Sequence, residues 1–454
     1  MQLKRRLTQA ACLAAVASAV IACTRMVTAP APATLVIDPI VADCNITNQD
    51  TPITPALLAA GVPCEVMATA PFDSLAHLQM GFDYYSWLTF LGLNAPAKGG
   101  PIGSGPMPGG DAPAAWEGWK EISEVMLKNG ARPSPWNSAR SIPAVCQGLG
   151  GGKLLSMVGK TATLLEDTNQ PFDTGPLIDQ NGNYARYEIL VNEPMFNYIV
   201  QNRLYSKTGQ AGFTSAVDFP AGTVIKGTSG TMGALMVKAA WKVMGAGDDP
   251  ARFHTTTALL YTAATADGKV GASCVKSRMG LVGLHVAHKT LLAPQWIWST
   301  FEHRANVPGA GAPAGAHYNF NNPACKGNCA VNQPPPRPWN PNVQPFPNGF
   351  TSQITRFTPI TPEVEQLNAR FQRLLPGKVW SNYDLVSTQW PTAPGSKTDP
   401  NGVPAPVFLA NTTMETYIQG KTPQSSSSCM ACHGNAAGTS GRKSDFTYIL
   451  ERAN

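Results

Sequence analysis

Residues 280–301 read GLVGLHVAHKTLLAPQWIWSTF and hold two apolar runs, Gly280–His288 and Gln295–Phe301, with branched and aromatic side chains. Runs of this length and composition are typical of buried β-strands. Similar runs come earlier, at Ala234–Val243 and Thr255–Thr262, and turn residues separate them. The helical crossovers of about 10–15 residues that parallel neighbours require are missing here. We therefore predict a largely antiparallel sheet.

Helical periodicity lies on both sides of these strands. Asn181-Gly182, between two strand-like runs in Leu177–Tyr184, predicts a hairpin. Long Pro- and Gly-rich loops connect the elements. These patterns place the chain in the α+β class, with several helices around the sheet. The predicted helices are 73–94, capped by Asp73 or Ser74; 111–130, capped by Asp111 and ended by Gly130; 194–205, capped near Asn192 or Glu193; 361–375, opened by Thr361-Pro362; and Thr412–Gln419.

The length and composition indicate a large globular chain. It has 454 residues, of which 43% are hydrophobic and 14% charged, with 42 Gly and 40 Pro. A chain of this size can bury a core without depending on disulfides. No apolar run of about 18 residues lies beyond the N-terminus, which excludes a membrane protein with several transmembrane helices.

The charge pattern does not favour a nucleic-acid partner. The formal net charge is +6, from 34 Lys and Arg against 28 Asp and Glu. Lys4, Arg5 and Arg6 belong to a segment expected to be removed, and without them 31 basic residues face 28 acidic ones. No run of Lys and Arg forms the basic stripe that nucleic-acid binding needs. We therefore expect no nucleic-acid partner.

The N-terminus has the pattern of an export signal. Lys4-Arg5-Arg6 precedes a short apolar stretch, and Val20-Ile21-Ala22-Cys23 looks like a bacterial lipobox in which Cys23 becomes the lipidated first residue. By resemblance to lipoproteins, Thr24 after this cysteine fits sorting to the outer membrane. We predict an exported, periplasmic protein that is anchored to the outer membrane by lipid. Cleavage after Ala33, which would yield a soluble periplasmic protein, is the alternative.

The ten cysteines suit an oxidising compartment. One lies in the signal, one ends the lipobox, and two form the motif described below. An even number remains, as expected for disulfides in an exported chain. These six are Cys44, Cys64, Cys146, Cys274, Cys325 and Cys329.

Six cysteines allow fifteen pairings, and the spacing favours two pairs. Cys44 and Cys64 bracket one Pro-rich segment and are predicted to join. Cys325 and Cys329 could close a small loop. A metal site at this second pair, with His317 nearby, would lack the further Cys or His pair of a zinc set.

Residues Cys429-Met430-Ala431-Cys432-His433 form C-x-x-C-H, the attachment motif of c-type haem. Two thiols three positions apart on one helical turn can form thioethers to the two vinyl groups of a haem. The next residue then offers its imidazole to the iron as the proximal ligand. A thioredoxin-like redox pair is the rival, although such a pair follows a strand in a βαβ unit, whereas four serines precede this one. A plain disulfide or a chance match is the remaining reading.

The chain resembles large exported bacterial proteins of the cytochrome c family. The segments that carry the resemblance are Leu177–Val191, Gly280–Pro308 and Leu409–His433. The resemblance implies one haem c per chain and redox chemistry, with Cys429 and Cys432 as attachment residues and His433 as proximal ligand. It implies no defined substrate.

The motif lies unusually late in the chain. Only 21 residues follow His433, and none is Met or His, so a distal ligand from the protein must come from upstream. The haem is therefore expected to dock on the large body, not to form a separate cytochrome domain. We divide the chain into a signal peptide at 1–22, a tether and extended lead-in at 23–70, an α+β body at 71–410, and a haem attachment segment packed on the body at 411–454.

Several residues are candidates for the distal position. Met414 is close to the motif in sequence, and its thioether would raise the reduction potential. His285 and His288 lie on one predicted strand and would point to opposite faces. An open or water-bound sixth position is the alternative to all of them. The other candidates are His303, His77, His254 and His317.

Three functions fit this pattern. The first is electron transfer at the bacterial cell envelope with an unknown redox partner. The second is a haem-dependent periplasmic oxidoreductase, peroxidase-like or acting on a small organic compound, in which the body forms the substrate pocket. The third is a binding or assembly protein whose haem is a sensor or a structural link. Groups that could serve the second function as acids, bases or polarising charges are Arg278, Arg304, His285 and His303.

Overall fold

The computed structural model describes residues 74–94, 113–158, 175–222, 232–264, 268–391 (without 292, 310, 311, 313, 314, 327, 328, 351 and 376), 404–420 and 428–454. The predicted signal peptide, Cys23, the tether, the Cys44–Cys64 pair and Asp111 lie outside these residues. None of the described helices is both long enough and apolar enough to cross a bilayer.

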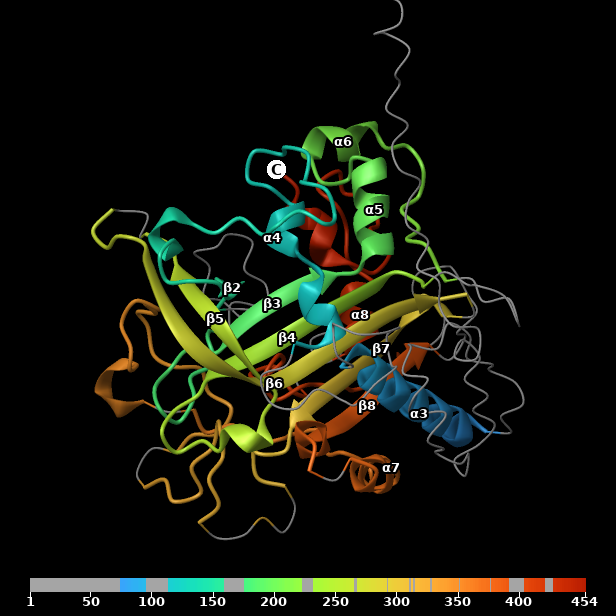
Figure 1. Ribbon diagram of the computed structural model, residues 1–454. Helices are drawn as coiled ribbons and strands as arrows, with labels where there is room; N and C mark the ends of the chain where they lie inside the picture. The colour runs from blue at the N-terminus through green and yellow to red at the C-terminus, as the bar shows by residue number, and fades with distance from the viewer. Residues whose placement is uncertain are drawn as a thin grey trace, which may run out of the picture. The chain divides into compact units, whose positions relative to one another are not determined.

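A nine-stranded, mostly antiparallel sheet organises the described residues, which confirms the predicted α+β class (Figure 1). One path through the sheet runs β1-β3-β4-β6-β7-β8-β9, while β5 pairs with β6 and with β2. Among the paired strands of the described residues, only β2 and β5 are parallel. The strands are β1 (Lys120–Glu121), β2 (Lys153–Leu155), β3 (Arg186–Val191), β4 (Leu235–Val243), β5 (Thr255–Thr262), β6 (Ser273–Thr290), β7 (Ala293–His303), β8 (Tyr383–Pro391) and β9 (Pro404–Ala405).

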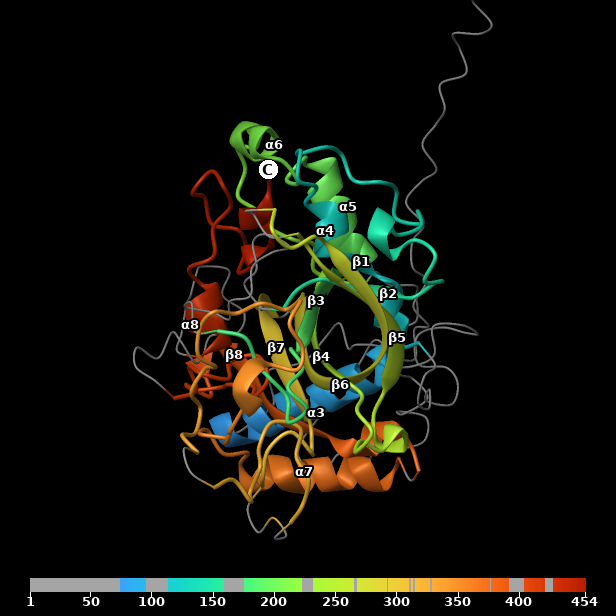
Figure 2. The ribbon, with the colours of Figure 1, turned by 90° about the vertical axis from the view of Figure 1, so that its left-hand side faces the viewer.

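Two of the long strands, β6 and β8, differ most from the sequence-based expectation, and the short strands β1, β2, β3 and β9 were not predicted either. β6 is twice as long as the predicted run, because Ser273–Gly280 pairs with β5 and the rest pairs with β4 and β7 (Figure 2). β8 was not predicted, because Asp384, Ser387 and Gln389 interrupt its apolar pattern. These polar side chains are largely buried and bond to neighbouring elements, so the run is a strand despite its polarity.

One side of the sheet, called the helix face, is covered by α3 (Leu75–Leu93) and α7 (Pro362–Arg373). Both were predicted, and Ser74 and Thr361 cap them through bonds to backbone N–H groups. Trp87 stacks on Phe371 with centroids 5.0 Å apart and meets Phe301 of β7 edge-on. The helix face is therefore held mainly by aromatic packing.

The opposite side, called the C-terminal face, shares a core with residues 409–420 and 428–454 and with α5 (Glu193–Gln201). Trp296 and Trp298 of β7 belong to this core, whereas Ile297 and Phe301 belong to the helix face. The alternation is that of a strand with both sides covered. Every residue of β7 is consequently buried.

Two predicted helices are wrong, and one predicted hairpin is reduced to a turn. The expected 111–130 helix is instead a 3₁₀ turn (Ala115–Gly118), the strand β1 and the short α4 (Ile122–Val125), because the chain extends after Gly118 so that β1 can pair with β3. Thr412–Gln419 forms successive turns. The predicted hairpin has one bridge, between Ile178 and Tyr184.

Two disulfides join described cysteines. The predicted Cys325–Cys329 loop is confirmed. Cys146 joins Cys274, which ties a 3₁₀ turn at Ala144–Cys146 to the start of β6. The sequence left this second pairing open.

Candidate cofactor site around Cys429–His433

The C-x-x-C-H motif forms one short helix, α8 (Cys429–His433), whose start is held by two side chains. Ser428 caps it by accepting a bond from the Ala431 N–H at 3.4 Å. Gln389 of β8 accepts the Met430 N–H at 2.7 Å and the Ser428 hydroxyl at 3.2 Å. These bonds satisfy N–H groups at the start of the helix and fix α8 against β8.

Cys429 and Cys432 are half-buried thiols that are not joined in a disulfide, unlike the two cysteine pairs described above. Three positions apart on a helix, they lie on one side of α8. Met430 between them is fully buried in the core of the C-terminal face. The helix therefore turns its methionine inward and leaves both sulfurs at the margin of the core.

The orientation of His433 is fixed by the chain end. Its Nδ1 donates to the Phe446 carbonyl oxygen at 2.7 Å, since a carbonyl can only accept. A neutral imidazole with its proton on Nδ1 has its lone pair on Nε2. The ring is buried, with its centroid 4.5 Å from the Trp298 ring and 5.4 Å from the Tyr448 ring. This is the tautomer in which Nε2 can ligate a metal.

The Phe446 carbonyl sits on a strained loop. Asp445 (φ 51°) and Phe446 (φ 62°) both occupy the left-handed region, which side chains other than glycine rarely adopt. The Asp445 carboxylate is bound by Lys289 Nζ at 2.6 Å and by the Phe219 N–H at 2.7 Å. Burial raises the pKa of Asp445, and the Lys289 ammonium opposes that shift. These contacts stabilise a backbone conformation that the loop would not hold alone.

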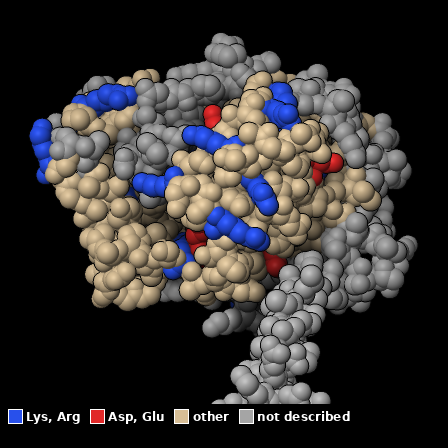
Figure 3. Space-filling view, turned by 90° about the horizontal axis from the view of Figure 1, so that it is seen from above, with Lys and Arg blue, Asp and Glu red and all other residues tan. Residues whose placement is uncertain are grey.

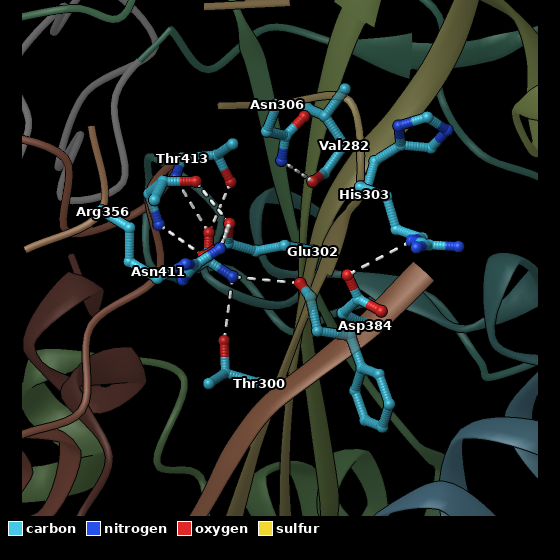
Figure 4. A network of polar contacts seen from close by, with 12 residues as sticks. Val282, Thr300, Glu302, His303, Asn306, Arg356, Asp384, Asn411 and Thr413 are labelled. Carbon is cyan, nitrogen blue, oxygen red and sulfur yellow. Dashed lines mark hydrogen bonds and ion pairs between the residues drawn. The ribbon is translucent and has the colours of Figure 1, made fainter. Parts of the chain in front are cut away.

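The segment that carries Met414 is fixed by a polar network on β7 (Figure 4). Buried Glu302 accepts bonds from Arg356 Nη2 at 2.7 Å and from the Thr412 N–H at 2.6 Å. Asn411 donates to the Thr300 hydroxyl at 2.9 Å and accepts from the Thr413 N–H. These bonds cap the start of the segment, and the Glu415 N–H donates to the Asn411 carbonyl at 2.8 Å, but the predicted Thr412–Gln419 helix does not continue and the segment forms successive turns.

Two of the proposed distal residues lie on the same side of the sheet as α8. Met414 is fully buried in the core that contains Met430. His285 projects toward the same side, with Nε2 3.4 Å from a Glu415 carboxylate oxygen. His288 instead bonds to the Tyr85 hydroxyl of α3 on the helix face. The predicted opposite orientation of His285 and His288 is therefore confirmed.

The other histidines have structural surroundings. His303 accepts from the Ala305 N–H and donates to the Arg252 carbonyl, and burial lowers its pKa to about 3. His254 is buried and bonds to Glu117 at 2.6 Å. His77 is half-buried, and His317 is exposed and lies 3.9 Å from Asp248. These contacts leave Met414 and His285 as the better distal candidates.

The four groups suggested for acid–base or polarising roles have different neighbours. Arg278 donates to the Thr255 hydroxyl, and Arg304 is half exposed and lies 3.6 Å from Asp384. His303 faces Phe253 with ring centroids 3.9 Å apart, whereas His285 is beside Glu415. The partners of these four residues lie on different elements, so the four do not make one acid–base group.

The motif by itself does not predict the contacts that position His433. Phe446 lies 13 residues after His433, Gln389 lies 41 residues before Met430, and Lys289 lies on another strand. The position of the motif near the end of the chain was the one feature of the sequence that indicated partners from the large body. Two thiols and an imidazole with Nε2 as acceptor fit the donor set of haem c. Among the described residues no group of three or more His, Cys, Asp or Glu could hold a metal ion by itself.

Comparison of the chain with protein-family models, with curated proteins and with solved structures gives no match.

Proposed function

We propose that the chain is a c-type cytochrome that carries one haem and transfers electrons at the bacterial cell envelope. The observation that carries the proposal is the geometry of His433, whose Nδ1 is engaged by the Phe446 carbonyl at 2.7 Å on a helix that also bears two thiols. When bound, haem supplies one-electron redox chemistry. Cys429 and Cys432 would hold it covalently, and His433 Nε2 would be the proximal ligand.

The surroundings of the motif support a rigid attachment site. Gln389 holds the first turn of α8, and Asp445 with Lys289 holds the loop that orients His433. A rigid site changes its geometry little between oxidation states, and this lowers the reorganisation energy of electron transfer. Met414 is our proposed distal ligand, because it is buried on the side of the sheet where α8 lies.

Export and anchoring belong to the same proposal. A signal peptide at 1–22 would bring the chain to the compartment where haem c is attached, and lipid on Cys23 would hold it at the outer membrane. The redox partner would then be another protein of the cell envelope.

One observation favours a second function, a haem-dependent periplasmic oxidoreductase. The C-terminal segment packs on a nine-stranded sheet, which is far more structure than haem attachment requires. In this alternative the body would form a substrate pocket and the sixth position of the iron would be open.

The test is the mass of denatured protein made in a host that attaches haem c. The wild type should weigh one haem more than the bare processed chain, and Cys429→Ser/Cys432→Ser should lose this increment. The control, Cys325→Ser/Cys329→Ser, removes the other closely spaced pair and should keep it. A wild-type mass without the increment contradicts the proposal.

Spectra of the same samples separate the two functions. A low-spin ferric haem that does not bind cyanide supports electron transfer. Its spectrum should contain a methionine–iron charge-transfer band that is absent in Met414→Ala and present in His285→Ala. A high-spin haem that binds cyanide and carbon monoxide supports the oxidoreductase.

A further inference from the structure

A cluster of exposed cations lies on the side of the molecule seen from above in Figure 3, around α6 (Lys207–Gly212). Three segments contribute two cations each and no acidic residue: 127–132, 202–213 and 434–444. All six side chains are exposed. This group is called the basic surface and comprises Lys128, Arg132, Arg203, Lys207, Arg442 and Lys443.

Hydrogen bonds and close contacts bring the three segments together. Gly130 lies against Asn454 and Ser206, and the Lys207 N–H donates to the Asn454 carbonyl at 3.1 Å. On the other side of α6, Arg442 donates to the Phe213 carbonyl at 2.5 Å. The buried Gln210 side chain bonds to both Leu450 and Thr439. The cations are therefore held on one continuous surface by residues far apart in sequence.

The charges of this surface are largely unbalanced. Lys128, Arg132, Arg203, Lys207 and Arg442 form no ion pair with any residue that the structure describes. In the adjoining Tyr448–Arg452 turn, Glu451 is offset by Arg452.

The basic surface also outweighs the charge of the whole chain. Beyond Lys4, Arg5 and Arg6 the sequence has 31 basic and 28 acidic residues. Among the residues that the structure describes, 25 basic side chains face 17 acidic ones, and the basic surface supplies six of this excess of eight positive charges. Such a concentration of charge orients an approaching charged partner.

The basic surface is built on the segment that bears the motif. Lys443 Nζ donates at 2.5 Å to the carbonyl of Gly434, the residue after His433. Lys443 also pairs with Ala437 in a β-bridge that follows α8. A partner seated on these cations would therefore be beside the proposed haem attachment helix.

We propose that the basic surface is the docking site for an acidic redox-partner protein. The inference rests on the proposed function, because it names the class of partner that would exchange electrons with the haem. Complementary charge steers such encounters and raises their rate. A protein fits better than a membrane, since none of the large apolar side chains exposed in the described residues lies in the three segments.

The test uses the holoprotein and an acidic plant-type ferredoxin as electron donor, with haem reduction followed by stopped flow at low and high salt. The reversal variant is Arg203→Glu/Lys207→Glu/Arg442→Glu. The control variant, Lys276→Glu/Lys326→Glu/Arg373→Glu, makes the same change in net charge at exposed cations of other segments. Reduced riboflavin, a small donor without net charge, checks that the haem remains reducible.

We expect salt to slow the wild type, the reversal variant to be slower by at least about 10-fold at low salt, and the control variant to stay within about twofold. Riboflavin should reduce all three equally. Equal slowing of both variants, or no effect of salt, overturns the proposal. A second result would also overturn the proposal. If ferredoxin reduces both variants at the same rate and the protein binds vesicles of phosphatidylcholine and phosphatidylglycerol strongly and in a salt-sensitive way, the surface binds lipid instead of a protein.

Failure of the proposed function gives a different result. If the purified chain has no covalent haem, the docking site is tested by binding of the same ferredoxin to the immobilised chain. Salt-sensitive binding that only the reversal variant loses supports the docking site without haem. Binding that both variants retain overturns it.

Discussion

The two sides of the sheet are covered in different ways. On the helix face, the 19-residue α3 and the 12-residue α7 pack aromatic rings against the strands. On the C-terminal face, residues 409–420 and 428–454 consist of turns and very short helices held by individual polar bonds. Aromatic packing gives stability but tolerates small shifts, whereas a hydrogen bond fixes particular atoms. The C-terminal face is thus the one suited to position ligands of a cofactor.

The largest expected effect is on the helix face. Trp87→Ala removes a fully buried ring that contacts Phe371, Phe90 and Phe301, and it should lower the free energy of unfolding by about 4 kcal/mol. Urea unfolding followed by fluorescence measures this change. Trp87→Phe, which keeps a ring but loses the bond to Asn368, is the control and should cost far less. Equal losses in both variants would show that the hydrogen bond, not packing, holds this face.

On the C-terminal face the largest effect is expected from Glu302. Glu302→Gln weakens a buried ion pair with Arg356 and a bond to the Thr412 N–H, so we expect a loss of about 2–3 kcal/mol. Hydrogen exchange should accelerate in residues 411–419 and stay unchanged in α3. Arg356→Met leaves the buried Glu302 carboxylate without its counter-ion, so it should cost at least as much as Glu302→Gln. Uniform acceleration across the sheet would contradict a local role for this network.

A buried carboxyl makes the helix face sensitive to pH. Burial raises the pKa of Asp83 to about 6 in the folded protein, against 3.8 for an ordinary aspartate. Below pH 4 both states hold the proton, and between pH 4 and 6 the unfolded chain loses it first. The contribution of Asp83 to stability therefore falls by about 3 kcal/mol over this range and is constant above it.

Asp83→Asn should remove this contribution. The measurement is the free energy of unfolding of the variant minus that of the wild type, taken at each pH. Asp179→Asn should remove a separate fall of similar size, because burial raises the pKa of Asp179 to about 6 as well, and the effects of the two variants should add. If Asp83→Asn leaves the pH dependence intact, another group causes it.

The smallest expected effect is at the start of α8. Ser428→Ala removes the cap of a single helical turn and should lower stability by about 1 kcal/mol. It should also reduce the yield of covalent haem in the holoprotein, because α8 would no longer present both thiols together. Ser428→Thr, which can still cap, should behave like the wild type in both measurements. A full haem yield in Ser428→Ala would show that Gln389 alone holds the helix.

The elements that could be predicted from the sequence are those whose signal is local. The strands β4 and β5 and the helices α3, α5 and α7 follow from periodicity and capping residues. β8 and the turns at Thr412–Gln419 could not be predicted, because buried polar side chains there bond to partners more than 100 residues away. A pattern of neighbouring residues contains no information about such partners.

The same division holds for the candidate site. The spacing of Cys429, Cys432 and His433 by itself predicts two thiols and an imidazole on one helical turn. Tertiary structure alone decides which imidazole nitrogen carries the proton, since the Phe446 carbonyl that binds Nδ1 sits on a strained loop held by Lys289 of β6. Tertiary structure also gathers six cations from three segments around α6. Spacing acts along the chain, whereas a proton position and a surface charge depend on what folding brings near.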